Sequence, residues 1–70
     1  MQERVVKMER INKNIAKFRK RAKMSQEDLA KQMKVSRCTV SAWELGRANP
    51  PVSRLKLLAK KLNVTVLDLI

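Results

Sequence analysis

One segment, residues 25–46, constrains the fold most, because it carries its own start and stop signals for two short helices. Ser25 can accept a hydrogen bond from the free backbone amides of a first helical turn. Asp28 places an acid in that turn, where the helix dipole favours negative charge. Ser36 repeats the capping role further along the chain. Gly46, the only glycine, can end a helix in the left-handed conformation.

These signals predict one helix over residues 26–33 and a second over residues 37–45. Only Lys34, Val35 and the cap Ser36 lie between the two. A connection this short is typical of a helix-turn-helix.

The second of these helices has two different faces. Val40 and Trp43 share the side that we expect to be buried. The opposite side carries no acid and consists of Arg37, Cys38, Ser41, Ala42 and Leu45. Small side chains let a helix backbone approach a partner surface closely, and the major groove of DNA is wide enough to admit a helix. These residues alone leave open the alternative of a solvated face on a small helical bundle.

The charge of the chain narrows the class of partner. Lys and Arg number 17 against 6 Asp and Glu, which gives a net charge of +11. A small domain with this charge attracts polyanions at long range. Charge does not separate DNA from RNA or from an anionic membrane. Single-stranded RNA is usually bound by stacking of its bases on aromatic side chains. Phe18 and Trp43 are the only aromatic residues, so the composition favours DNA over RNA.

The residue types present exclude several kinds of site. Cys38 is the only cysteine and there is no histidine, so neither an intramolecular disulfide nor a structural zinc site can form. No catalytic constellation and no glycine-rich phosphate loop is present, so we expect no enzyme activity and no cofactor or metal. No apolar run is long enough to span a bilayer and no secretory signal is visible. We therefore expect a cytoplasmic, nucleoid-associated protein that does not bind a membrane.

The rest of the chain predicts three further helices. Apolar residues at alternating spacings of three and four predict a helix over residues 10–22, and the same stripe could carry it back toward Arg4. The stripe is Met8, Ile11, Ile15, Phe18 and Ala22. Pro50 and Pro51 make the following loop non-helical. A fourth helix is expected from Pro51 or Val52 to Leu62. Its expected buried stripe is Val52, Leu55, Leu58, Ala59 and Leu62.

Asn63 is expected to adopt a left-handed conformation, and Thr65 to cap a last turn over residues 66–70. The predicted fold is all-α, a compact five-helix bundle formed by residues 10–70. Residues 1–9 are predicted to be an N-terminal extension that the apolar stripe could make helical.

Residues 25–30 and 35–50 resemble the helix-turn-helix of the XRE family, to which the lambdoid phage repressors and Cro belong. The similarity continues through Leu58-Ala59 and residues 64–66, and it covers residues 11–70. It implies a lambda repressor-like bundle in which residues 37–45 form the recognition helix. It also implies a sequence-specific regulator of transcription, a repressor that binds double-stranded DNA at a palindromic operator as a homodimer.

The resemblance assigns roles to particular residues. The base-reading positions are Arg37, Cys38, Ser41 and Ala42, and the DNA-backbone positions are Gln26, Ser36, Thr39 and Arg47. It also implies that Arg19 pairs with Glu44. Many relatives have glycine where this chain has Lys34, which predicts a strained left-handed lysine in the turn.

The chemistry of two base-reading residues leaves alternatives open. Arg37 can donate two hydrogen bonds to guanine, or it can contact a phosphate instead. Cys38 can make a small, weakly polar contact, or it can act as a redox-sensitive thiol in an electropositive site.

Two other functions fit the same composition. An antitoxin would bind DNA together with a protein partner, and co-purification of a second protein would favour it. A cationic amphipathic membrane binder is the other alternative, but the helix caps, the Gly46 stop and the Pro50-Pro51 loop favour a fixed fold. For a homodimer, the expected contact surfaces are the Pro50-Pro51 region, Leu67 and Ile70.

Overall fold

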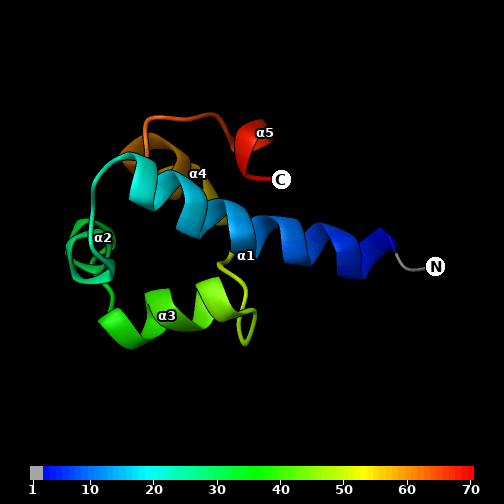
Figure 1. Cartoon of the computed structure of the whole chain (residues 1–70), viewed down its shortest axis with the longest axis horizontal. Helices are drawn as coiled ribbons and strands as arrows, with labels where there is room; N and C mark the ends of the chain where they lie inside the picture. Colours follow the sequence, from blue (N-terminus) through cyan, green and yellow to red (C-terminus); the bar gives the residue numbers. More distant parts are fainter. Residues whose placement is uncertain (1–2) are drawn as a thin grey trace.

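The computed structural model describes the backbone of residues 3–70 and the side chains of residues 10–70. It contains five helices, and residues 3–70 include no strand (Figure 1). The helices are α1 (Glu3–Arg21), α2 (Gln26–Met33), α3 (Arg37–Leu45), α4 (Val52–Lys61) and α5 (Val66–Leu69). The expected all-α bundle is therefore confirmed.

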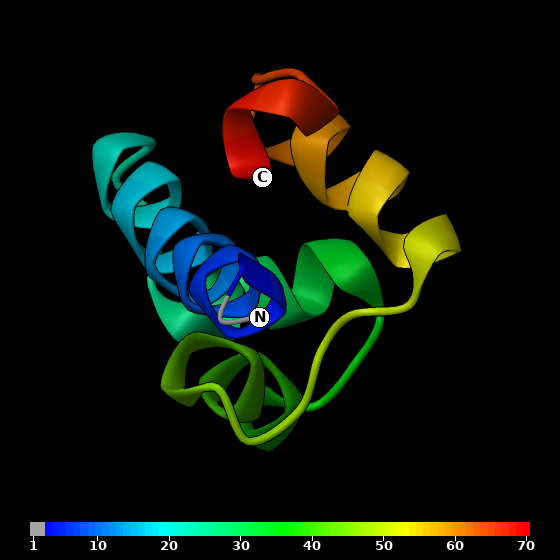
Figure 2. The ribbon, with the colours of Figure 1, turned by 90° about the vertical axis from the view of Figure 1, so that its right-hand side faces the viewer.

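Each helix contributes to a single aliphatic core. The buried residues include Ile15 of α1, Leu29 of α2, Val40 of α3, Leu58 of α4 and Leu69 of α5. In both views of the ribbon, α3 lies below α1 and α5 lies above it, and Figure 2 shows α4 beside α1 (Figures 1 and 2). This arrangement leaves one side of α3 without a cover from the rest of the bundle.

Two short helices are closed at their N-termini by reciprocal capping boxes. The Ser25 hydroxyl accepts a hydrogen bond from the Asp28 amide at 2.9 Å, and the Asp28 carboxylate accepts one from the Ser25 amide at 3.0 Å. Thr65 and Asp68 repeat this pattern at α5. The backbone hydrogen bond from Ser25 lowers the pKa of Asp28, and the one from Thr65 lowers the pKa of Asp68. Both acids therefore stay ionised to a lower pH than a free aspartate does.

The observed helix ends match the predicted ones closely, with one exception. The predicted bounds of α2 and α3 agree with the structure, while α4 and α5 each end one residue earlier than expected. α1 begins at Glu3 instead of Arg10, close to the Arg4 start that the apolar stripe allowed, so the segment expected to be a possibly helical extension is helical from Glu3 onward. Met1 and Gln2 of that segment lie outside the described residues. No observation tests the division into an extension and a domain at residue 10, which stays a prediction.

Two described residues of the predicted apolar stripes are exposed, and the side chain of Met8 lies outside the described ones. Val52 is 73% exposed because it is the first residue of α4, and the covered part of its stripe begins one turn later, at Leu55. Ala22 is exposed because α1 ends at Arg21, so Ala22 already belongs to the turn. Both errors come from extending a helical periodicity to the ends of a helix.

Within residues 3–70, four residues have left-handed backbone conformations. Lys34 (φ 58°), Asn63 (φ 61°) and Gly46 (φ 78°) were expected, whereas Lys23 (φ 60°) was not. Lys23 and Lys34 follow α1 and α2 respectively, where a left-handed residue lets the chain turn away from a helix. Residues other than glycine, asparagine and aspartate rarely adopt this backbone conformation, so the two lysines are strained.

Replacing Lys34 by glycine should stabilise the protein by about 1 kcal/mol, because glycine adopts a left-handed conformation without the clash of a Cβ atom. Urea unfolding followed by circular dichroism would measure this change. Lys31→Gly, at an exposed position inside α2, is the matched control, and it should cost about 1 kcal/mol. Destabilisation by Lys34→Gly would contradict the idea that Lys34 is strained.

Candidate nucleic-acid interface

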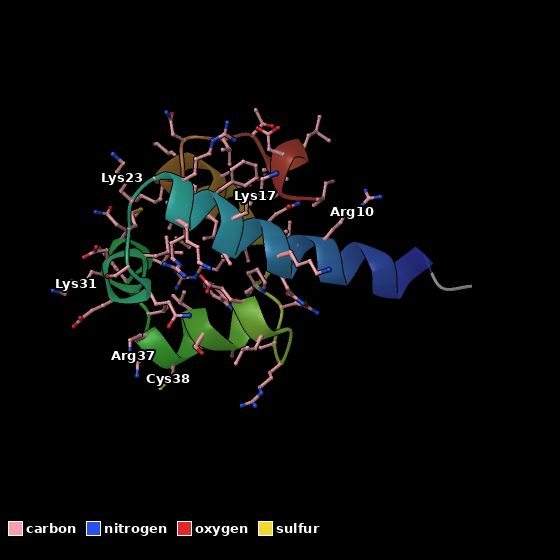
Figure 3. All side chains as sticks on the ribbon, in the orientation of Figure 1. Arg10, Lys17, Lys23, Lys31, Arg37 and Cys38 are labelled. Carbon is pink, nitrogen blue, oxygen red and sulfur yellow. The ribbon has the colours of Figure 1, made fainter. Side chains whose placement is uncertain are left out.

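The outer face of α3 lies open to solvent. Arg37 and Cys38 are exposed, Ser41 and Ala42 are half-buried, and Leu45 is 64% exposed. These five residues and Arg47 line a shallow hollow of about 200 Å³. Figure 3 shows Arg37 and Cys38 pointing away from the bundle. The structure thus brings together all four residues expected at base-reading positions.

The inner face of α3 is apolar and buried. Val40 has no exposed surface and Trp43 is 3% exposed. Burial of both side chains fixes which face of this short helix points outward. Together they account for the amphipathic pattern that separated the two faces in the sequence.

The N-terminus of α3 presents the hydroxyl groups of Ser36 and Thr39. The Ser36 hydroxyl accepts a hydrogen bond from the Thr39 amide at 3.1 Å, and the two hydroxyl oxygens lie 2.9 Å apart. The remaining backbone amides in the first turn of a helix have no carbonyl acceptor within that helix. The N-terminus of a helix therefore attracts anions. Ser36 is exposed and Thr39 is half-buried, so this end of α3 is accessible to a phosphate group.

A largely buried polar network joins the inner side of α3 to α1. Arg19 of α1 donates from Nε to Glu44 Oε2 at 2.5 Å and from Nη2 to Glu44 Oε1 at 3.2 Å. Arg19 Nη1 also donates to the Met24 carbonyl at 2.8 Å. The side chains of Arg19 and Glu44 are only 10% and 8% exposed. The expected pair is therefore present, and it joins α1 directly to α3.

Gln26 adds α2 to this network. Its Nε2 donates to Glu44 Oε1 at 2.9 Å, so the side chain is oriented by a residue of α3. Gln26 is also the first residue of α2, where backbone amides lack helical acceptors. Its position therefore combines a structural contact with an exposed helix end. We refer to these three side chains as the Arg19–Glu44–Gln26 network.

Gly46 ends α3 in close contact with α1. A Cβ atom on Gly46 would lie 2.6 Å from Nδ2 of Asn12, which is 9% exposed. The Arg47 amide donates to the Ala42 carbonyl at 2.9 Å, and this closes the end of the helix. Arg47 is thereby held beside the outer face of α3.

The sequence reasoning missed two residues that support the interface. One is Asn12, whose position three residues before Ile15 places it on the predicted apolar stripe of α1. A polar residue on that stripe was a detectable signal. The other is Arg54 of α4, which donates to the Met33 carbonyl at 2.9 Å and so stabilises the end of α2. No local pattern marks Arg54, because its partner is distant in the sequence.

Acidic side chains are absent from the outer face of α3. Among the described side chains, Asp28 and Asp68 are caps, and Glu44 is paired with Arg19. Glu27 is exposed in the first turn of α2. The positive charge of Arg37 and Arg47 is therefore not neutralised by an ion pair within residues 10–70. This surface can attract a polyanion and can bring a helix close to it.

Other kinds of site find little support in the described residues. In residues 3–70, no helix combines the length and apolarity that crossing a bilayer requires. Across the side chains of residues 10–70, no cluster of three His, Cys, Asp or Glu forms a metal site.

Comparison with known proteins points to one family. The family described as "Helix-turn-helix" matches residues 15–69. A curated relative, the HTH-type transcriptional activator BcrR from Enterococcus faecalis, is 36% identical over 59 residues. That alignment covers 84% of this chain and 29% of the relative, so the chain spans less than a third of the relative's length. No solved structure matches the chain.

Proposed function

The chain belongs to the XRE-type helix-turn-helix family of DNA-binding transcriptional regulators, and from this premise we propose that it is a repressor recognising a specific operator. The observation that carries the proposal is the outer face of α3, which has no acid and is exposed, while its inner face is fixed to the core. A helix of this kind can enter the major groove of DNA.

We assign base reading to the outer face of α3. Arg37 can donate two hydrogen bonds to O6 and N7 of a guanine, and Ser41 can bond to any of several bases. Ala42 offers only a methyl group, which suits the methyl of thymine. Cys38 lies between these residues and makes a small contact. Their shared position on one hollow supports a single reading surface.

We assign contacts with the DNA backbone to the ends of the helices. The first turns of α2 and α3 carry Gln26, Ser36 and Thr39, and both turns can bind a phosphate through free amides. Arg47 adds a positive charge beyond the end of α3. These contacts would position the recognition helix, while its outer face reads sequence.

Repression requires only that the protein occupy its operator, and a DNA-binding domain alone can do this. The relative's printed name, transcriptional activator, supports the alternative that this domain activates from its bound position. Activation would need an additional contact with another protein. We therefore propose repression as the simpler function of the described residues.

We further propose that the protein binds as a homodimer to a palindromic site. In that arrangement the recognition helices enter successive major grooves about 34 Å apart. Leu67 is 79% exposed and Pro51 is exposed, so both remain candidates for the dimer contact, together with the half-buried Ile70. Pro50 is buried, which leaves it unable to contribute to such a surface.

Selection of bound sequences from a random DNA pool at about 0.15 M salt should yield one enriched motif, because specificity has meaning only at a stated salt concentration. Arg37→Ala should then relax the preference at one base pair, at a cost of about 1–3 kcal/mol in discrimination. Arg47→Ala is the matched control. It should weaken binding to all sequences alike and reduce the salt dependence by about one phosphate contact.

Two outcomes would contradict the proposal. Selection without any enriched motif would remove sequence specificity altogether. If Arg37→Ala and Arg47→Ala behaved alike, Arg37 would be a phosphate contact and base reading would rest on other residues.

A further inference from the structure

A second pocket lies on the side of α1 away from α3. It has a volume of about 300 Å³ and lies between the end of α1 and the turn that joins α4 to α5. Its lining residues are Phe18, Arg21, Ala22, Leu62, Asn63 and Val64. Figures 1 and 2 show the turn between α4 and α5 above α1, whereas α3 lies below α1, so DNA on the outer face of α3 would leave this pocket open.

The pocket has an apolar floor and a polar, positive rim. Phe18 and Leu62 are buried and Val64 is half-buried, whereas Arg21 and Asn63 are exposed. The Lys17 ammonium and the Arg21 guanidinium lie 5.4 Å and 5.9 Å from the centroid of the Phe18 ring. Figure 3 shows Lys17 on the side of α1 opposite Arg37 and Cys38. Two cations thus converge on the aromatic side chain of the pocket.

These cations lack a carboxylate partner among the described side chains, where the ion pair present is Arg19–Glu44. Asp68 lies close enough for Arg21 to help lower its pKa, but its carboxylate caps α5 through the Thr65 amide. An incoming carboxylate would therefore relieve the repulsion between Lys17 and Arg21 and would meet little competition.

We propose that this pocket docks a short acidic segment of a partner protein. An apolar side chain of that segment enters the pocket and contacts Phe18 and Leu62, while flanking carboxylates pair with Lys17 and Arg21. Charge complementarity identifies the acidic partner, and the concave apolar floor favours a peptide over a second DNA duplex, whose backbone offers no apolar side chain to fill it. The site goes beyond DNA binding and can be occupied while α3 is bound to an operator.

The test uses the ¹⁵N-labelled chain and an acetylated, amidated hexapeptide of alternating leucine and glutamate. Two-dimensional NMR should show shifts in the amide signals of Ala22, Asn63 and Val64, with little change in α3. A leucine–glutamine peptide and a serine–glutamate peptide should each bind at least about tenfold more weakly, because each lacks one of the two required contacts.

Three variants make the test specific. Arg21→Gln should weaken binding of the leucine–glutamate peptide by about tenfold. Lys31→Gln removes the same charge from an exposed position on α2 and should leave binding within about twofold, since distant surface charges are screened. Ala22→Phe keeps the charge and fills the pocket from an exposed position, so it should abolish binding while circular dichroism shows an unchanged fold.

Several results would overturn the proposal. Shifts confined to α3 and Arg47 would mean that the acidic peptide merely imitates DNA. Equal binding of the serine–glutamate peptide would remove the role of the apolar floor. Displacement of the peptide by an operator duplex would show that DNA covers this pocket. Failure to bind any operator would leave the peptide result unaffected, so the two proposals fail separately.

Discussion

Glu44→Ala should destabilise the protein by about 3–5 kcal/mol, because it leaves the Arg19 guanidinium buried without its counter-charge. The side chains of Arg19 and Glu44 are only 10% and 8% exposed, so the guanidinium has little access to solvent water. Gln26 would lose its acceptor in the same substitution. A small domain has a total stability of only about 5–15 kcal/mol, so the loss would be large. Urea unfolding at low temperature, followed by circular dichroism, would measure it.

A double variant separates the loss of the pair from the loss of packing. Replacing both Arg19 and Glu44 by methionine removes the two charges together, and we expect it to be more stable than Glu44→Ala alone, because buried pairs can be exchanged for apolar residues at little cost. A loss within about 0.5 kcal/mol for Glu44→Ala is typical of a neutral surface change and would contradict an energetic role for the pair.

Gly46→Ala should destabilise the protein by about 2–5 kcal/mol. A left-handed alanine costs about 1–2 kcal/mol, and forcing an additional carbon into a packed site costs about 1–3 kcal/mol. The new Cβ would lie 2.6 Å from Nδ2 of Asn12, a residue that is only 9% exposed. The measurement is again the free energy of unfolding in urea.

The background variant Asn12→Ala divides this cost into its two causes. Without the amide of Asn12, the additional Cβ meets no clash, and Gly46→Ala should cost only the backbone strain of about 1–2 kcal/mol. A coupling energy between the two sites is expected, since residues in contact are not additive. Equal costs in both backgrounds would show that the Asn12 contact carries no energy.

The helix-turn-helix could be predicted from sequence because its signals are local. The Ser25 and Ser36 caps and the Gly46 stop lie within or beside the helices that they define, and the observed bounds of α2 and α3 match the prediction. The left-handed conformation of Lys34 was expected only through the resemblance to a family in which glycine is common there. No residue pattern in a lysine itself indicates a positive φ.

Features that depend on distant contacts or on missing signals were harder to predict. α1 begins at Glu3, near the Arg4 start that the apolar stripe allowed, and the choice between this start and Arg10 was open because no capping residue marks either. Lys23 was missed because lysine is not a turn residue, although its amide closes the end of α1 on the Lys20 carbonyl. Asn12 packs against Gly46, and Arg54 donates a hydrogen bond to the Met33 carbonyl. Both partners are far away in the sequence, so no local pattern marks these contacts.

In the candidate site, too, some features could be predicted from the sequence and others depend on how the helices pack. Which residues share the outer face of α3 follows from helical spacing, and the structure places them together on one hollow. The link of Gln26 to Glu44 required the packing of α2 against α3, which spacing within either helix does not contain. The roles of these residues toward DNA stay predictions until binding is measured.

The buried side chains that anchor α3 to the bundle lie on its inner side and include Val40, Trp43 and the Arg19–Glu44–Gln26 network. The six residues that line the hollow in front contribute none of the described buried core. The four exposed side chains among them, those of Arg37, Cys38, Leu45 and Arg47, are therefore expected to tolerate exchange without loss of folding. A scaffold with this separation can be retargeted to a new operator, by evolution or by an engineer, through changes on one helical stripe.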